Sequence, residues 1–309
     1  MSRILLSGIT GFVSGELIPN LIDRGHEIYG ISRYVTGRVA PINSIPTYFA
    51  DLRDGFTIRK IVRDVQPDKV IHVGALSRVS ESYDHPQEFV EANLQGTINL
   101  AEACLRECHN FKQFLFAATS EMFGNNGFEI QKETNPRNPA SPYAVSKVAC
   151  ENYLNYMREA YNFPSTILIP YNTYGRKKDF HFFVERTITQ MLTKNKVSLI
   201  DPEPIRDWMF IKDHANAYLT CLENEKAIGE TFNFCTGTGM SIKETAELIA
   251  KLTDFKGEII WNSGPKRPTE SKVIIGNNDK SKKILNWTPK YTLEKGLKLT
   301  IENLREEVL

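Results

Sequence analysis

Short apolar runs and stretches of helical spacing alternate along the first half of the chain. The run at 3–7 is followed by Gly8, Gly11 and a helical pattern over 12–24. Further strands are predicted at 26–32, at a run ending near Ala50, and at 70–73, 114–118 and 165–170, with helices over 55–65 and 86–108 and from Tyr143 onward. This alternation is typical of an α/β protein built on a Rossmann-type, doubly wound parallel sheet.

The pattern becomes less regular after Tyr161. We predict a turn-rich segment at 170–175, then helices over 182–192, from about Asp213 and over 242–252, strands at 197–200, 231–235 and 258–261, and two short helices at the end. Ser241 and Glu244 have the spacing of a capping box. We expect a larger domain of 1–170 plus about 208–235, and a smaller C-terminal α/β domain of 171–207 and 236–309.

Charge and hydropathy narrow the class of protein. The 309 residues include 38 Lys and Arg and 37 Asp and Glu, for a net charge of +1, so no global field favours nucleic acid or an anionic membrane. The N-terminus lacks the pattern of a signal peptide, and no stretch is long and apolar enough to span a bilayer. We expect a soluble, cytoplasmic protein without a nucleic-acid or membrane partner.

The five cysteines are scattered and odd in number, which fits a reduced, intracellular compartment. Cys104 and Cys108 have i, i+4 spacing and could share a metal ion, but no neighbouring set of His or Cys completes the ligands. We therefore expect the cysteines to pack in the core, and we predict no metal site.

Gly8 and Gly11 mark a strand, turn and helix at the N-terminus. Glycines there let the backbone approach a pyrophosphate, whose charge the free N–H groups of the helix stabilise, although an isolated pair can also be a tight turn without a ligand. The second strand ends in Ser32-Arg33, with Arg38 nearby, where NAD-binding folds carry an acidic residue. A cation suits the 2'-phosphate of NADP, so we predict NADP; the alternative is that Arg33 is a solvated loop charge.

Two hydroxyls and a carboxylate, Thr119-Ser120-Glu121, end the fifth predicted strand, and Tyr143 and Lys147 follow on a helix. At i, i+4 the lysine shares a helical face with the tyrosine, where its charge favours the phenolate and lowers a pKa that is ordinarily near about 10. The tyrosine then becomes a general base near neutral pH. Such pairs also occur on solvated helices, and the nucleotide turn in the same chain favours catalysis.

The other cofactor candidates lie near the ends of the predicted strands, where open parallel sheets bind ligands. Asp51 and Leu52 are placed to meet an adenine ring, and Ala75 follows the fourth strand among small residues. The predicted cofactor-binding set is Gly8, Thr10, Gly11, Phe12, Val13, Arg33, Asp51, Leu52, Ala75, Tyr143 and Lys147.

With these motifs the chain resembles an extended short-chain dehydrogenase/reductase acting on nucleotide sugars, and the resemblance covers nearly its whole length. It implies that Tyr143 and Lys147 are the catalytic pair, that Thr119 binds the reacting oxygen of the sugar, and that the smaller domain binds the nucleotide sugar. The substrate-binding residues that it implies are Ser77, Asn172, Arg206, Arg267 and Glu270. It also implies a homodimer or higher homo-oligomer, formed through helices around 93–108 and 144–156.

Glu121 distinguishes the reactions within this family. Simple 4-epimerases often lack a carboxylate at this position, whereas removal of water needs one. The chain is most similar to GDP-mannose 4,6-dehydratases, which carry segments like 141–145, 206–208 and 267–270 and use NADP. The resemblance therefore implies a lyase that converts GDP-mannose to GDP-4-keto-6-deoxymannose through transient C4 oxidation. The implied catalytic residues are Thr119, Ser120, Glu121, Tyr143 and Lys147.

The chain departs from that group at several points, and other reactions stay open. Ser14 stands where the third glycine of the turn is usual, the chain is short, and its 176–178 segment is not typical. The alternatives are an NADPH-dependent reductase of 4-keto-6-deoxy nucleotide sugars, a nucleotide-hexose 4-epimerase, and a UDP-glucuronate decarboxylase, which usually carries the acid missing after the second strand. A non-catalytic NADP-sensing protein would be free to lose Tyr143 or Lys147.

Overall fold

The computed structural model describes residues 1–33, 45–175 and 181–308, and its main feature is a seven-stranded sheet with the order β12-β7-β5-β4-β1-β2-β3. Every pairing in this sheet is parallel. Its strands are β1 (Arg3–Ser7), β2 (Glu27–Ser32), β3 (Thr47–Phe49), β4 (Lys69–His72), β5 (Gln113–Ala117), β7 (Ser165–Pro170) and β12 (Thr231–Phe234). The order reverses between β1 and β4, the position at which such sheets bind ligands.

Both faces of the large sheet are covered by helices. Alternate strand residues point to opposite faces, so Leu5 packs in the cluster with α2, α5 and α6, whereas Ile4 and Leu6 pack in the cluster with α1 and α8. These helices are α1 (Phe12–Asp23), α2 (Gly55–Val65), α5 (Gly96–Glu107), α6 (Pro142–Tyr161) and α8 (Ile211–Leu222). Burial on both faces explains the continuous apolar strands and confirms the predicted doubly wound fold.

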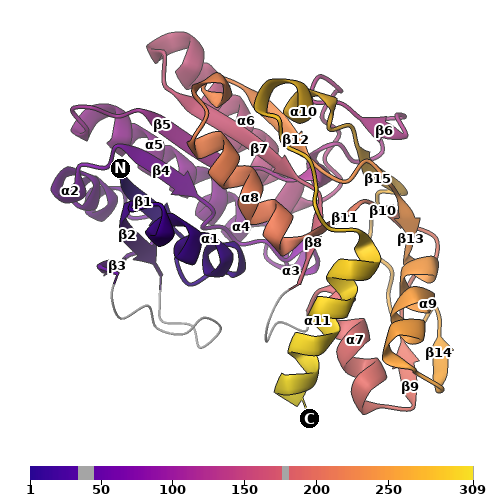
Figure 1. The fold of residues 1–309 in the computed structure, drawn as a ribbon. Coiled ribbons are helices and arrows are strands. Elements are labelled where there is room, and N and C mark those ends of the chain that lie inside the picture. Colours follow the sequence, from indigo (N-terminus) through magenta and orange to yellow (C-terminus); the bar gives the residue numbers. More distant parts are fainter. Residues whose placement is uncertain (34–44, 176–180, 309) are drawn as a thin grey trace.

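A smaller α/β unit lies at one end of the large sheet. Its helices α7, α9 and α11 share a third apolar cluster, and Figure 1 shows them gathered with β9 and β14 away from the large sheet. The helices are α7 (Phe183–Thr193), α9 (Ile242–Thr253) and α11 (Leu293–Val308). The short strands outside the large sheet are β6 (Ile130–Gln131), β8 (Asn172–Tyr174), β9 (Lys196–Ser198), β10 (Ile205–Arg206), β11 (Trp208–Phe210), β13 (Met240–Ser241), β14 (Glu258–Ile260) and β15 (Val273–Gly276). This unit confirms the smaller C-terminal α/β domain expected from the sequence.

The structure differs from the sequence prediction mainly in short elements. The segment predicted as turns at 170–175 contains β8, which pairs in parallel with β11. The helix predicted over 86–108 is interrupted by a π-helical turn at Glu91–Gln95, and α11 is longer than the short helix predicted. The remaining elements are α3 (Val79–Asp84), α4 (Pro86–Val90), α10 (Asp279–Leu285) and two 3-10 turns, Ser120–Met122 and Glu225–Ala227. The capping box is confirmed, because Glu244 N–H donates to Ser241 Oγ over 3.1 Å.

The cysteines are all free thiols, and four of them are buried. Cys104, Cys150 and Cys235 pack in one apolar cluster and Cys221 in another, as expected for core residues. Across 1–33, 45–175 and 181–308, no group of three or more His, Cys, Asp or Glu side chains is arranged to hold a metal ion. Within the same ranges, no helix is long and apolar enough to cross a bilayer.

Candidate active site

A cavity of about 590 Å³ opens at the carboxyl ends of β1, β4, β5 and β7, against the smaller unit. The large sheet contributes the segments after its strands, and the smaller unit contributes residues around Arg206 and Arg267. All predicted catalytic and substrate-binding residues line it, namely Ser77, Thr119, Ser120, Glu121, Tyr143, Lys147, Asn172, Arg206, Arg267 and Glu270. Of the cofactor candidates, Gly11, Phe12, Val13 and Ala75 line it as well, whereas Gly8, Thr10, Arg33, Asp51 and Leu52 lie outside its lining.

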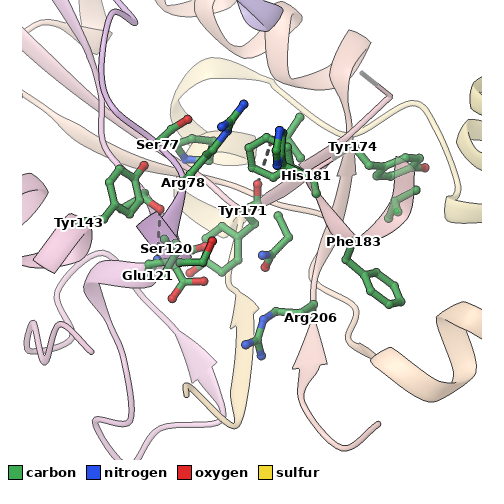
Figure 2. A pocket seen from close by; sticks show the side chains of 18 of the residues that line it. Ser77, Arg78, Ser120, Glu121, Tyr143, Tyr171, Tyr174, His181, Phe183 and Arg206 are labelled. Carbon is green, nitrogen blue, oxygen red and sulfur yellow. Dashed lines mark hydrogen bonds between the residues drawn. The ribbon is translucent and has the colours of Figure 1, made fainter. Parts of the chain in front are cut away.

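Tyr143 lies in the first turn of α6, which is fixed by its capping residues. Ser141 Oγ accepts a hydrogen bond from Ala144 N–H over 3.1 Å, and Pro142 occupies the first helical position. The Tyr143 ring is 8% exposed and packs edge-on against Phe89. Figure 2 shows Tyr143, Ser120 and Glu121 on one side of the cavity, with Arg206 further along it.

Lys147 lies one helical turn after Tyr143 and is almost completely buried, at 3% exposure. Its Nζ donates to the Ala117 carbonyl over 2.7 Å and lies 4.7 Å from the centre of the Phe116 ring. Burial lowers the pKa of Lys147 to about 8, because the charged form loses its hydration. The side chain therefore stays predominantly cationic at neutral pH, which places a positive charge at the floor of the cavity beside the tyrosine helix.

Thr119, Ser120 and Glu121 follow the end of β5 in a tight turn. Thr119 and Ser120 are buried, and Thr119 Oγ1 accepts a hydrogen bond from Glu121 N–H over 3.3 Å. Glu121 is partly exposed and lines the cavity. Its charge also contributes to a raised pKa at Glu270, whose main cause is burial. Glu121 thus lines the same cavity as Tyr143 and acts electrostatically on Glu270, the carboxylate that contacts Arg206 and Arg267.

The glycine turn has the geometry that a pyrophosphate site needs. Gly8 has φ +71°, and a Cβ there would lie 2.7 Å from the Cα of Gly74. Ser14 occupies the place of the usual third glycine without crowding it, because its buried Oγ donates to the Gly8 carbonyl over 2.8 Å. Gly11 leaves the N-terminus of α1 without a capping side chain, and a helix N-terminus stabilises a nearby anion. This turn fits a dinucleotide cofactor.

The end of β2 carries a cation and no acidic side chain. Ser32 is buried beside Thr10, with 3.1 Å between their hydroxyl oxygens, and Arg33 Nη1 lies 3.8 Å from Glu88 Oε1. Asp51 binds Arg53 over 2.7 Å, and this hydrogen bond holds the pKa of Asp51 below its usual range. Leu52 packs against the core cluster beside α5. Arg38 and the 176–178 segment fall outside the described residues.

Two arginines of the smaller unit share one carboxylate. Arg206 is 4% exposed and donates to the Ser271 carbonyl over 2.8 Å and to Glu270. Arg267 Nη1 lies 3.2 Å from Glu270 Oε2. Burial raises the pKa of Glu270, and Arg267 and Arg206 only partly oppose that shift. Two guanidinium groups with a single carboxylate leave this end of the cavity positive.

Asn172 was predicted, and its buried Oδ1 accepts no hydrogen bond from the described residues. Several other lining residues were not predicted from the sequence. Tyr171 could have been found by the same strand-end argument as its neighbour Asn172. The others come from loops and helices of the smaller unit or from α8, and their direction depends on tertiary packing. The unpredicted polar and aromatic lining residues include Arg78, Tyr171, His181, Phe183, Arg186 and Tyr218.

Comparisons with known proteins identify relatives over nearly the whole chain. The model of the family described as GDP-mannose 4,6 dehydratase matches residues 5–300. The GDP-mannose 4,6-dehydratase of Yersinia enterocolitica is 27% identical over 95% of this chain and 91% of its own.

Two solved structures have the same fold over almost their full lengths. The UDP-glucose 4-epimerase of Thermotoga maritima, determined with UDP-glucose, is 28% identical with a TM-score of 0.92, covering 99% of this chain and 100% of its own. The UDP-glucose 4-epimerase of Thermus thermophilus, in complex with NAD, is 28% identical with a TM-score of 0.90, covering 98% and 99%. Relatives of this chain therefore include both dehydratases and epimerases.

Proposed function

Because the chain belongs to the GDP-mannose 4,6 dehydratase family of extended short-chain dehydrogenases/reductases, we propose that it is a nucleotide-sugar 4,6-dehydratase. The proposed reaction converts GDP-mannose to GDP-4-keto-6-deoxymannose through transient oxidation at C4 by bound NADP+. The observation that carries this choice is Glu121, a carboxylate lining the same cavity as Tyr143 and Lys147.

Tyr143 is proposed as the base for the first step. It removes the proton of the C4 hydroxyl, and the buried charge of Lys147 favours the phenolate that this requires. Thr119 donates a hydrogen bond to the C4 oxygen and fixes its position. NADP+, when bound at the glycine turn, supplies the hydride acceptor at C4 and the hydride donor at C6.

Glu121 is proposed as the base for the elimination. The new C4 ketone makes the C5 proton acidic, and Glu121 removes it and passes it to the C6 hydroxyl, which leaves as water. Ser120 orients that hydroxyl, and C5 takes a proton from solvent when the double bond is reduced. No cofactor is consumed, because the hydride taken from C4 returns at C6.

The smaller unit is proposed to bind the nucleotide. Arg206 and Arg267 would bind the diphosphate, and Glu270 would exchange its arginine partners for the nucleotide. Ser77 and Asn172 would bind the sugar, since both line the cavity that Tyr143 also lines. We propose the domain boundaries that the sequence predicts. In this division α8 and β12 belong to the larger domain, because α8 covers the large sheet and β12 extends it. We also retain a homodimer through α5 and α6, where Val145 and Tyr156 are 48% and 49% exposed.

NADP is proposed over NAD because β2 ends in Ser32-Arg33. The Arg33→Ala variant should bind NADP+ about 10- to 100-fold more weakly, since a charge-assisted hydrogen bond to the 2'-phosphate is lost. Its affinity for NAD+ should stay the same. Titration calorimetry with both cofactors measures this, with Arg106→Ala, an exposed arginine on α5, as the matched control. Equal losses for NADP+ and NAD+ would contradict a role at the 2'-phosphate.

A 4-epimerase is the second candidate, supported by the two solved epimerases of the same fold. Glu121 argues against an epimerase, because rotating a 4-keto sugar within the site needs no acid or base in addition to the tyrosine and lysine. A reductase of 4-keto-6-deoxy nucleotide sugars would use the same tyrosine and lysine but consume NADPH. A non-catalytic NADP-sensing protein has no need of the Tyr143 and Lys147 arrangement.

One assay separates these reactions. Purified protein with catalytic NADP+ and GDP-mannose should yield a 4-keto-6-deoxy product without net formation of NADPH, whereas UDP-glucose should react more slowly. An epimer of either sugar in place of the keto product would identify an epimerase. Stoichiometric oxidation of NADPH by keto sugars alone would identify a reductase, and no reaction with any sugar would contradict catalysis.

A further inference from the structure

Unlike the other arginines that line the cavity, Arg186 has no acidic partner among the residues that the structure describes. It lies in the first half of α7 and lines the cavity together with Arg206 and Arg267. Its Nε is buried and donates no hydrogen bond to any residue in the described ranges, and no salt bridge within those ranges involves it. Burial lowers the pKa of Arg186, and the charge of Arg267 lowers it further. The guanidinium is therefore partly desolvated and lies near a like charge.

The charges at this end of the cavity do not balance. Arg186, Arg206 and Arg267 contribute three positive charges, and Glu270, whose pKa is raised by burial, contributes at most one negative charge. Lys266 and Asp201 neutralise each other in an ion pair of 2.9 Å. Glu121 also lines the cavity and acts electrostatically on Glu270, so the three arginines outnumber these two carboxylates. The remaining positive charge favours an anion such as a diphosphate diester, which carries one negative charge on each phosphate.

A partly buried guanidinium without an acidic partner costs free energy in the ligand-free protein and favours an anionic ligand. Its partial removal from water is unfavourable, and no acidic side chain in the described ranges compensates for it. A phosphate oxygen that reaches Arg186 forms a charge-assisted hydrogen bond to a side chain that the fold has already partly removed from water. The free-energy cost in the ligand-free protein is thus offset when an anion binds.

We propose that Arg186 is a further substrate-binding residue, which binds the diphosphate of the nucleotide sugar together with Arg206 and Arg267. This inference rests on the proposed function, since it takes the ligand to be a nucleoside diphosphate sugar. Arg206 is held by Ser271 and Glu270, and Arg267 contacts Glu270, whereas the buried Nε of Arg186 donates to none of the described residues.

The Arg186→Met variant tests this, because methionine keeps the apolar stem and removes the charge. We expect the Kd for GDP, measured by titration calorimetry, to rise by about 10- to 100-fold. The Kd for NADP+ should not change, and the Tm of the ligand-free protein should stay equal or rise. Arg186→Lys should recover part of the GDP affinity, since it restores the charge but not the planar fork.

Arg158→Met is the matched control. Arg158 is also largely buried, and burial lowers its pKa, but its donors are satisfied by Ser165 Oγ at 2.8 Å and the Glu230 carbonyl at 3.0 Å. This variant should lower the Tm and leave the Kd for GDP unchanged.

The outcomes separate the inference from the proposed function. An unchanged Kd for GDP in Arg186→Met would overturn the inference, and a lower Tm without a change in Kd would assign Arg186 a structural role instead. Wild-type protein that binds neither GDP nor UDP would instead overturn the proposed nucleotide-sugar substrate. Weaker binding of GDP by Arg186→Met, with an intact Tm, supports both.

Discussion

Replacing Glu121 by glutamine should lower kcat for the complete dehydration by about 10²- to 10⁴-fold while leaving the oxidation at C4 intact. Glutamine keeps the shape of the side chain but cannot take the C5 proton. Thr119, Tyr143 and Lys147 are unchanged, so hydride should still pass from C4 to the cofactor. In a single turnover with GDP-mannose, the absorbance of reduced nicotinamide should therefore rise and persist, whereas in the wild type it should be transient.

The same variant gives a second readout in heavy water. Wild-type protein should place one solvent deuteron at C5 of the product, and Glu121→Gln should slow this exchange in parallel with kcat. Glu129→Gln, an exposed glutamate in the following loop, is the matched control and should behave as the wild type. Full dehydratase activity in Glu121→Gln would remove this residue from the mechanism, and retained epimerisation alone would favour the 4-epimerase.

The large sheet could be predicted from the sequence because its signals are local. Its strands are apolar on both faces, as Leu5 and Leu6 illustrate by packing in opposite clusters, and helices with clear spacing separate them. The glycine turn, the strand-end hydroxyls and the Tyr143 helix follow from the same rule, since all lie at the carboxyl ends of predicted strands. The structure brings these candidates to one cavity.

The smaller unit could not be predicted at the same level, because its strands are short and their pairing is nonlocal. β8 and β11 have three residues each and pair across more than thirty intervening positions, between Asn172 and Trp208 at one end. Such strands have too few residues to show an alternating pattern. The direction of Arg186 into the cavity depends on how α7 packs against α9 and α11, which no local pattern encodes.

Ser14 shows how a departure from a motif can be accommodated. A glycine at this position is usual where a helix packs closely on a strand, and Ser14 adds a side chain there. Its hydroxyl donates to the carbonyl of Gly8, so the added atoms form a hydrogen bond within the turn. The sequence could identify the departure but could not show that the hydroxyl had a partner.

Replacing Tyr143 by phenylalanine should lower kcat by about 10²- to 10⁴-fold by stopping the reaction before the hydride leaves C4. The ring packing against Phe89 is retained and only the hydroxyl is lost, so the fold and the affinity for GDP should be unchanged. In the single-turnover experiment no reduced nicotinamide should form, in contrast to its accumulation in Glu121→Gln. The two variants thus place the tyrosine before the carboxylate in the reaction sequence.

Tyr153→Phe is the control for this change, because it makes the same substitution on the same helix outside the cavity. Tyr153 donates to Glu102 Oε1 over 2.8 Å at a partly buried position, so its loss should affect stability slightly and kcat hardly at all. If Tyr143→Phe still produced reduced nicotinamide at the wild-type rate, another group would have to take the C4 hydroxyl proton. The buried charge of Lys147 would then have no phenolate to stabilise, and the proposal that α6 is the catalytic helix would be wrong.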